Sequence, residues 1–367
     1  MHPAEGSERN PGFLKTGTMA SILTPFIALY AAMLLVAMSL GLLTTFLGLR
    51  LNFEGFSVQV SGVILTFYFI GSVVGNFYCS RLIRNVGHIR AFTAFAAIGT
   101  AMIMLHGYYI SAVAWAICRF FSGLAAIGLY MVIESWLNEC TPPYARGRVF
   151  SIYMVVNYLG AGIGQQFLHL GEVKDQSLFL LIGFLLVSCI IPVASTRSIS
   201  PEMAKSEPMK LKYIIQKAPM GMIGCFTAGL VTSSFYTIAP LFCHQINLTL
   251  SQISYFMTIT VLGGLLLQWP VGLISDRFDR SLAIPALGSL FALMSGVMVL
   301  TAQSSVGVLM VSTALFGGLM FTIYPTAVAR VHDMFEAKDV VHVSAAVLLF
   351  FGVGAMIGPL ASSSTIA

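Results

Sequence analysis

Hydrophobic runs of about twenty residues recur along the whole chain, and they restrict the possible folds more than any other feature. A helix needs about twenty apolar residues to cross the hydrocarbon core of a bilayer. A membrane barrel would instead show alternating segments of about ten residues. The composition agrees with helices in lipid, because 57% of the 367 residues are hydrophobic and only 9% are charged, against about a quarter charged in soluble domains. We therefore expect an all-α membrane protein.

The runs predict eleven membrane-spanning helices. The first run is too long for a signal-peptide core and no small-residue cleavage site follows it, so we expect it to persist as a helix. The predicted spans are 21–48, 57–80, 90–108, 111–139, 147–170, 177–196, 218–243, 251–275, 281–302, 306–332 and 339–362.

The basic residues predict the orientation of these helices. With a cytoplasmic N-terminus, sixteen of the nineteen Lys and Arg residues fall on the inner side. The outer loops hold only Arg50 and Lys174, and Arg119 lies inside a span. This asymmetry is the positive-inside pattern. It predicts a multi-pass protein of the cell inner membrane, and it accounts for the net charge of +5 without nucleic-acid binding.

The six cysteines lie in or at the ends of hydrophobic runs, and no CxxC pair occurs among them. We interpret them as small buried apolar residues. The sequence predicts no metal site and no cofactor.

A polar, basic stretch at 197–217 divides six predicted helices from five. We expect a linker whose apolar face lies on the cytoplasmic membrane surface. The domain plan is then a cytoplasmic tail (1–20), a six-helix bundle (21–196), the linker (197–217) and a second bundle (218–367).

The two bundles resemble each other in sequence, which predicts a duplicated unit. Gly123 precedes Tyr130 by seven residues, as Gly317 precedes Tyr324, and the glycines of 160–164 match Gly352 and Gly354. The offsets are 192 to 194 residues. At that offset the sixth span has no counterpart before residue 367, so we expect a twelve-helix plan in which this chain holds eleven helices.

Three motifs resemble those of the major facilitator superfamily (MFS). Gly272–Arg280 is similar to its G-x-x-x-D-R-x-G-R-R loop, Arg119–Gly123 to its fourth-helix R-x-x-x-G, and Glu139–Gly147 to its E-x-x-P-x-x-x-R-G element. The resemblance covers the whole chain apart from the twelfth helix. Glu134, Trp136 and Asn138 ahead of Arg146 further resemble the bacterial YcaD-type branch.

The resemblance implies the MFS fold: two pseudo-symmetric six-helix bundles with 11 of 12 helices present here. It also implies that Asp276, Arg277, Arg280, Glu139 and Arg146 belong to cytoplasmic gating motifs. Two positions depart from the family pattern. Arg84 stands where the first-half loop has its Asp, and Asp279 replaces a Gly. The resemblance implies that the first-half Asp helps to lock the outward-facing state, so this lock is in doubt here. Asp276 and Arg277 are the candidates to take over its role.

Two charges inside predicted spans require an explanation, because each costs about 2.5–3.5 kcal/mol on insertion scales. Arg119 shares a helix face with Gly123, Ala126 and Tyr130. The resemblance associates it with proton transfer or anion attraction, and the alternative is an Arg that bonds backbone carbonyls. Glu134 is either a proton carrier or a structural ion pair with Arg81, Arg146 or Arg148.

Uncharged residues complete the predicted substrate and proton pathway: Tyr130, Asn157, Ser233, Tyr236, Gln268 and Tyr324. For each of them the alternative is an interhelical hydrogen bond worth under about 1 kcal/mol. Tyr130 and Tyr324 are related by the repeat, and we hypothesise that they face each other.

The favoured function is a secondary active transporter that moves a small solute by alternating access, coupled to protons as a symporter or antiporter. The expected partners are the solute, protons and the lipid bilayer, and we expect a monomer. The alternative is a transporter-like membrane protein without transport activity, such as a sensor, an assembly partner or a truncated remnant. No Ser–His, Cys–His or metal constellation indicates an enzyme.

Overall fold

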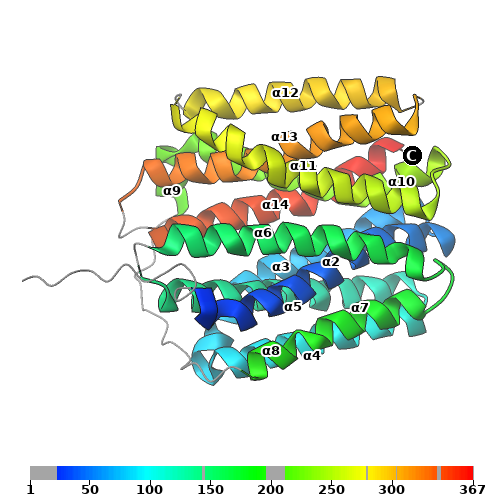
Figure 1. The fold of residues 1–367 in the computed structure, drawn as a ribbon, viewed down its shortest axis with the longest axis horizontal. Helices are drawn as coiled ribbons and strands as arrows, with labels where there is room; N and C mark the ends of the chain where they lie inside the picture. Colours follow the sequence, from blue (N-terminus) through cyan, green and yellow to red (C-terminus); the bar gives the residue numbers. More distant parts are fainter. Residues whose placement is uncertain are drawn as a thin grey trace, which may run out of the picture.

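The structure is a computed structural model that describes residues 23–142, 145–195, 211–277, 280–302, 304–336 and 340–366. Within these residues every regular element is a helix, and the long helices run side by side (Figure 1). The elements are η1 (Thr24–Phe26), α2 (Ile27–Phe53), α3 (Val58–Val86), α4 (His88–Tyr108), α5 (Ala112–Cys140), α6 (Arg146–Gln166), η3 (Phe167–Leu170), α7 (Ser177–Ser188), α8 (Ile190–Ala194), α9 (Leu211–Lys217), α10 (Pro219–Gln245), α11 (Leu250–Arg277), α12 (Arg280–Thr301), α13 (Val306–Asp333) and α14 (Val340–Ile366).

Each of the eleven predicted spans coincides with a helix of the described chain. Ten helices are long and apolar enough to cross a bilayer. The eleventh is α6, whose 21 residues include several glycines and polar side chains. The first span was placed too early: α2 continues to Phe53, because Arg50 and Glu54 form an ion pair across its last turn. The sixth span is divided into α7 and α8 at Cys189.

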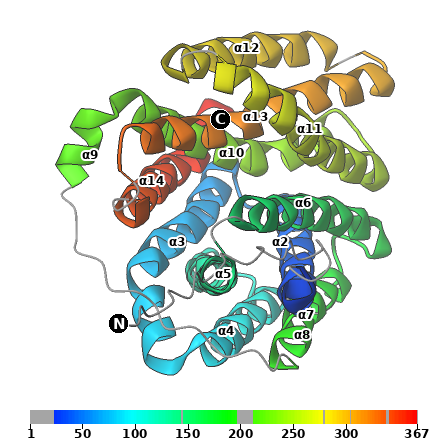
Figure 2. The same ribbon diagram turned by 60° about the vertical axis from the view of Figure 1, so that its left-hand side comes forward.

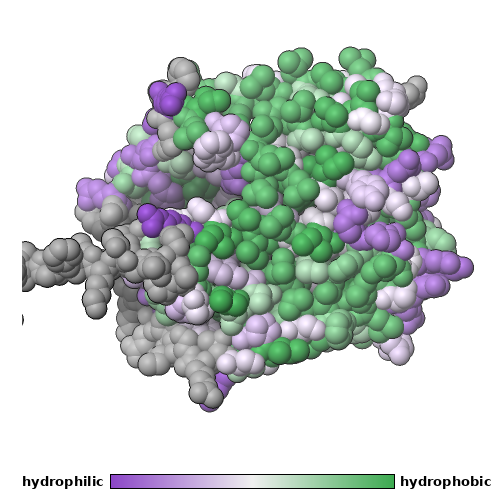
Figure 3. Space-filling view, viewed as in Figure 1, coloured by the Kyte–Doolittle hydropathy of each residue, from purple (hydrophilic) through white to green (hydrophobic). Residues whose placement is uncertain are grey.

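Apolar side chains form a broad band around the middle of the molecule, and polar side chains gather at its two ends (Figure 3). Large apolar residues on the outer helix faces are well exposed, such as Leu266, Leu293 and Leu300. Exposed apolar surface of this extent is typical of a protein solvated by lipid. Five of the six cysteines are buried and all six are free thiols.

The helices gather in two groups (Figure 2). The first bundle holds α2 to α8, with extensive contacts of α3 with α5 and of α2 with α6. The second bundle holds α10 to α14, with the corresponding contacts of α11 with α13 and of α10 with α14. We call the end of the molecule that carries α9 the linker end (left in Figure 1) and the opposite end the far end.

Equivalent glycines pack the corresponding helix pairs in the two bundles. A Cβ atom on Gly123 of α5 would overlap the carbonyl oxygen of Tyr68 on α3. In the second bundle a Cβ atom on Gly317 of α13 would overlap the carbonyl oxygen of Thr260 on α11. The helix backbones approach this closely because glycine has no side chain. The offset of the glycines, 317 − 123 = 194, agrees with the predicted repeat.

The second equivalent pair corrects the alignment of the repeat. Gly160 of α6 packs on Leu34 of α2, and Gly354 of α14 packs on Phe226 of α10. The counterpart of Gly160 is therefore Gly354, again at an offset of 194, and the alignment of Gly160 with Gly352 was wrong by two residues. Packing against the neighbouring helix decides the register, and glycine spacing alone does not.

Candidate functional site

The two bundles are joined by hydrogen bonds at the far end, where α6 contacts α11. The side-chain amide of Gln166 donates to the hydroxyl of Thr258, with 2.6 Å between N and O. Thr258 in turn donates to the carbonyl oxygen of Gly162 at 3.1 Å. The hydroxyl of Ser254 donates to the carbonyl oxygen of Gln165 at 2.7 Å. All of these residues belong to the last turns of α6 or the first turns of α11.

Two further contacts between the bundles also lie toward the far end. Between α3 and α14, the Thr66 hydroxyl approaches the carbonyl oxygen of Met356 at 3.4 Å, and Gly62 lies against Ser363. Between α2 and α10, Gly48 packs on Pro240. We call these far-end contacts the seal; they consist of hydrogen bonds and of close packing at glycines.

On the linker side of this seal lies a cavity of about 430 Å³ between the bundles. From the first bundle, α6 contributes Met154 and Tyr158 to its wall. The second bundle contributes Thr232 of α10, Gln268 of α11, Phe351 of α14 and several residues of α13 between Met320 and Ala329. Ala329 lies four residues before the end of α13, so the cavity extends toward the linker end.

Two of the predicted pathway residues, Gln268 and Tyr324, line this cavity. Tyr236 lies beside the wall, since its ring centre is 6.4 Å from that of Phe321. Sequence reasoning missed Tyr158, Thr232, Phe321 and Phe351. The helix face they occupy depends on helix rotation, which hydropathy does not determine in a span that is apolar all round.

Glu134 of α5 accepts a hydrogen bond from the hydroxyl of Tyr153 on α6, with 2.8 Å between the oxygens. It also lies near Tyr130 on the same helix and near Tyr324 on α13. Its counterpart in the repeat is residue 328, and Val328 lines the cavity. Among the described residues Glu134 has no ion-pair partner, so its observed partner is a tyrosine instead of the proposed arginines.

Arg119 of α5 is 4% exposed and lies outside the cavity wall, nearer the far end. Its guanidinium carbon is 4.3 Å from the centre of the Tyr68 ring on α3. Its Nε atom is buried and has no hydrogen-bond partner in the part of the chain that the structure describes. The alternative in which Arg119 bonds backbone carbonyls is therefore not observed, and the aromatic ring is its partner.

The other uncharged candidates lie away from the cavity wall. Ser233 is 1% exposed and packs between α10 and α14 against Gly358, where its hydroxyl donates to the carbonyl oxygen of Leu230. Asn157 is half-buried on the face of α6 that also carries Gly160, which packs on α2. Tyr130 is half-buried and is absent from the described wall.

Among the predicted gating residues whose side chains the structure describes, Glu139, Arg146 and Arg277 form no ion pair with one another. Arg146 is exposed, and an oxygen of Glu139 is buried without a hydrogen-bond partner among the described residues. Arg277 is exposed at the end of α11. The side chains of Asp276 and Arg280 lie outside the described part of the structure. The geometry therefore forms no Glu139–Arg146 ion pair at this end.

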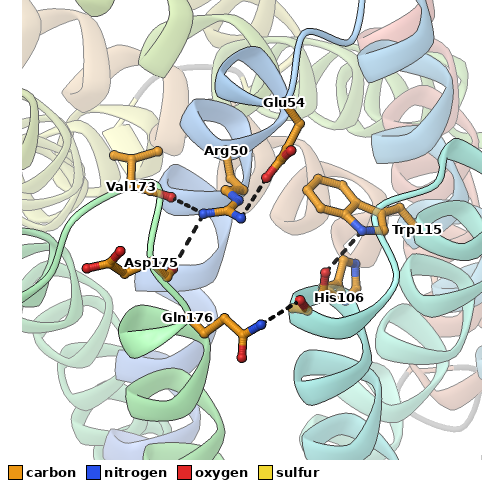
Figure 4. Close-up of polar contacts among 8 residues, drawn as sticks. Arg50, Glu54, His106, Trp115, Val173, Asp175 and Gln176 are labelled. Carbon is orange, nitrogen blue, oxygen red and sulfur yellow. Dashed lines mark hydrogen bonds and ion pairs between the residues drawn. The ribbon is translucent and has the colours of Figure 1, made fainter.

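A cluster of polar contacts that the sequence did not predict lies at the far end of the first bundle (Figure 4). Arg50 forms an ion pair with Glu54 at 2.6 Å and donates to the carbonyl oxygen of Val173 at 2.6 Å. Nearby, the Trp115 indole donates to the carbonyl oxygen of His106. The i,i+4 spacing of Arg50 and Glu54 was the available signal. The cluster ties α2 to the loop before α7.

Two helix bundles, an apolar belt and a cavity between the bundles define a polytopic membrane protein of the transporter class. The sequence model of the Major Facilitator Superfamily matches residues 29–359. The chain belongs to this family, and it is a membrane transporter of a solute rather than an enzyme.

Curated relatives and solved structures agree with this assignment. The chain is 28% identical over 345 residues to "Uncharacterized MFS-type transporter YcaD" of Escherichia coli O17:K52:H18, covering 93% of this chain and 88% of that protein. The crystal structure of nucleoside transporter NupG has a TM-score of 0.78 at 11% identity, covering 93% of this chain and 91% of that chain. A bacterial homologue of the lysosomal transporter Spinster, in an inward-facing and unoccupied conformation, has a TM-score of 0.72 at 12% identity, covering 94% and 82%. At these identities the two structures support the fold alone.

Proposed function

We propose that the chain is a secondary active transporter of the bacterial inner membrane, which moves a small solute by alternating access and is coupled to protons. One observation carries the proposal: the bundles are sealed at the far end, while a cavity lies between them toward the linker end. A solute site between two bundles that separate at one end is the arrangement that alternating access requires.

The distribution of basic residues supports a cytoplasmic linker end. Arg81, Arg84 and Arg148 lie in helix turns at that end, and only Arg50 and Lys174 lie at the far end of the described chain. By the positive-inside rule the linker end and the N-terminus are cytoplasmic. In the proposed cycle, an arrangement with the cavity toward the cytoplasmic linker end is the inward-facing state. The proposed transporter acts as a monomer in the bilayer.

The seal is built of contacts that are weak enough to open. Each hydrogen bond between helices contributes about 0.6 kcal/mol in membrane proteins, and the described contacts of the seal are hydrogen bonds and close packing at glycines. Solute binding and proton release need to supply only a few kcal/mol to change the population of two such states.

Glu134 is the proposed proton carrier. It is a carboxyl group inside a membrane span, it accepts a hydrogen bond from Tyr153, and it lies within electrostatic range of Tyr324 on the other bundle. Protonation therefore alters the interaction between the two bundles, which is the property that coupling needs.

A transport assay in proteoliposomes with an imposed pH gradient tests the proposal. A metabolite mixture outside the vesicles is followed by mass spectrometry of the vesicle contents. We expect solute flux that depends on the gradient in the wild type and flux without that dependence in Glu134→Gln. Glu172→Gln is the matched control, because Glu172 is an exposed far-end residue paired with Lys174. Gradient-dependent flux in Glu134→Gln would contradict the role of Glu134, and no flux of any solute would contradict transport.

A further inference from the structure

We propose that the transported solute is uncharged and carries an aromatic or similarly flat ring together with hydrogen-bonding groups, and that the second bundle provides most of its binding site. The inference rests on the proposed function, since it identifies the solute class of the same cavity. It follows from the chemistry of the residues that line the 430 Å³ space, a volume within the range of about 300–1,000 Å³ of small-molecule sites.

The cavity wall offers rings and methionines as its apolar surface. Tyr158 and Phe321 lie edge to face with 5.7 Å between ring centres, and Tyr324 and Phe351 do so at 4.9 Å. Met320 adds a flexible thioether. Aromatic rings favour offset or edge-to-face contact with a further ring, and methionine adapts to irregular apolar shapes. This lining favours a ring-bearing solute over a small hydrophilic one.

Four polar side-chain groups on the same wall have no hydrogen-bond partner among the residues that the structure describes. Thr232, Gln268, Tyr158 and Tyr324 line the cavity, and the structure gives their side chains no hydrogen bond to any described residue. Buried polar groups are normally paired, and leaving them unpaired on occlusion costs about 1–3 kcal/mol each. A solute with hydroxyl, amide or ring-nitrogen groups would satisfy them when the cavity closes.

None of the described residues of the wall carries a formal charge. A charged solute would lose its hydration on occlusion without gaining a counter-charge, which is strongly unfavourable. The two charged residues inside the spans of the first bundle have partners away from the wall: Glu134 is bonded to Tyr153, and Arg119 is stacked on Tyr68. The anionic solute that Arg119 suggested from the sequence is therefore disfavoured in this state.

The test uses three probes that share one ring and differ in charge. N-acetyltryptophanamide is uncharged, N-acetyltryptophan is an anion and tryptophanamide at pH 6 is a cation. They are supplied at equal concentration, with a general metabolite mixture, to proteoliposomes of the full chain, and vesicles without protein correct for passive permeation. We expect accumulated solutes to be uncharged and ring-bearing, with the uncharged probe entering at least fivefold faster than the charged ones.

Two variants of wall residues test whether the preference for uncharged, ring-bearing solutes arises in the cavity. Gln268→Leu removes an amide without loss of volume, and Phe321→Ala removes a ring; each is expected to reduce uptake of the uncharged solutes about tenfold. Gln245→Leu at the exposed far end of α10 is the control and is expected to transport normally. Preferred uptake of charged solutes would overturn the solute class while transport stands. Uncharged uptake unaffected by both wall variants would overturn the site. Absence of all flux would overturn the proposed function itself.

Discussion

The guanidinium carbon of Arg119 lies 4.3 Å from the ring centre of Tyr68, and the repeat replaces this pair by Thr313 and Thr260 in the second bundle. The two hydroxyls of the threonine pair are 2.7 Å apart. The same junction between two helices is thus held by a cation on a ring in one bundle and by a hydrogen bond in the other. The two units keep a contact at this junction with different chemistry, and at this junction only the first bundle carries a buried charge.

The ring of Tyr68 is expected to stabilise the buried charge of Arg119. Tyr68→Leu leaves the guanidinium without its partner and should lower the free energy of unfolding by about 2 kcal/mol, the value of a desolvated cation–π contact. Tyr68→Phe keeps the ring and should be close to wild type. Unfolding by SDS titration in mixed micelles measures both.

Tyr78→Leu is the control for this prediction, because Tyr78 lies on the same helix and is 61% exposed. A similar loss in Tyr68→Leu and Tyr78→Leu would show that the contact with Arg119 contributes nothing. A large loss in Tyr68→Phe would assign the effect to the hydroxyl group instead of the ring.

The Thr258 hydroxyl is expected to hold the far end closed. Thr258→Val preserves shape but removes the hydrogen bonds with Gln166 and Gly162, which together are worth about 1 kcal/mol. The population of far-end-open molecules should rise about fivefold. Spin labels at Asn52→Cys and Gln245→Cys, on a Cys140→Ala background, report the distance between α2 and α10 by pulsed EPR. Thr93→Val removes a hydroxyl bonded only within α4, and an equal shift there would refute a specific latch.

Close packing of α3 on α5 predicts that Gly123→Ala destabilises the fold. The added methyl group would overlap the Tyr68 carbonyl oxygen, and overpacking of this kind costs about 1–3 kcal/mol. Gly288→Ala on α12 meets no atom within 4 Å and should be neutral or slightly stabilising, since alanine favours helix by up to about 1 kcal/mol. Thermal unfolding in detergent compares the two, and equal midpoints would contradict the close approach.

The buried ion pair at the far end is expected to matter more than the exposed one. Glu54→Gln leaves the Arg50 guanidinium, 6% exposed, without its carboxylate, and should cost about 1.5–3 kcal/mol. Glu172→Gln breaks a pair whose side chains are 66% and 59% exposed and should cost less than about 1 kcal/mol. The same SDS titration measures both variants, and high salt should reduce only the small effect of Glu172→Gln.

Part of the fold follows from residue types in order along the chain. Apolar runs of about twenty residues predicted the long helices of the described chain and the α7–α8 pair, because helices satisfy their own backbone hydrogen bonds in lipid. The basic residues predicted which helix ends lie together. The apolar runs also predicted α6 as a helix, although its hydropathy is the weakest among the long helices of the described chain.

The site was predicted only in part, for a physical reason. Gln268 and Tyr324 were found because polar residues in spans are conspicuous, whereas Phe321 and Phe351 are ordinary apolar residues until the helix rotations place them on the wall. Ser233 was equally conspicuous in sequence, but packing against Gly358 buries it between two helices. Spacing along one helix gives the directions of its side chains relative to one another. It does not say which of these directions faces the cavity.

The sequence by itself determined the membrane as the medium, the long helices of the described chain, the repeated glycines and the family motifs, since these depend on local composition and order. Only the tertiary structure decided that Arg119 stacks on Tyr68, that Glu134 is bonded to Tyr153, and that the bundles meet at the far end. Those facts depend on how helices rotate and approach each other. The approach is set by glycines such as Gly123 and Gly160, whose missing side chains have an effect only where another backbone fills the space.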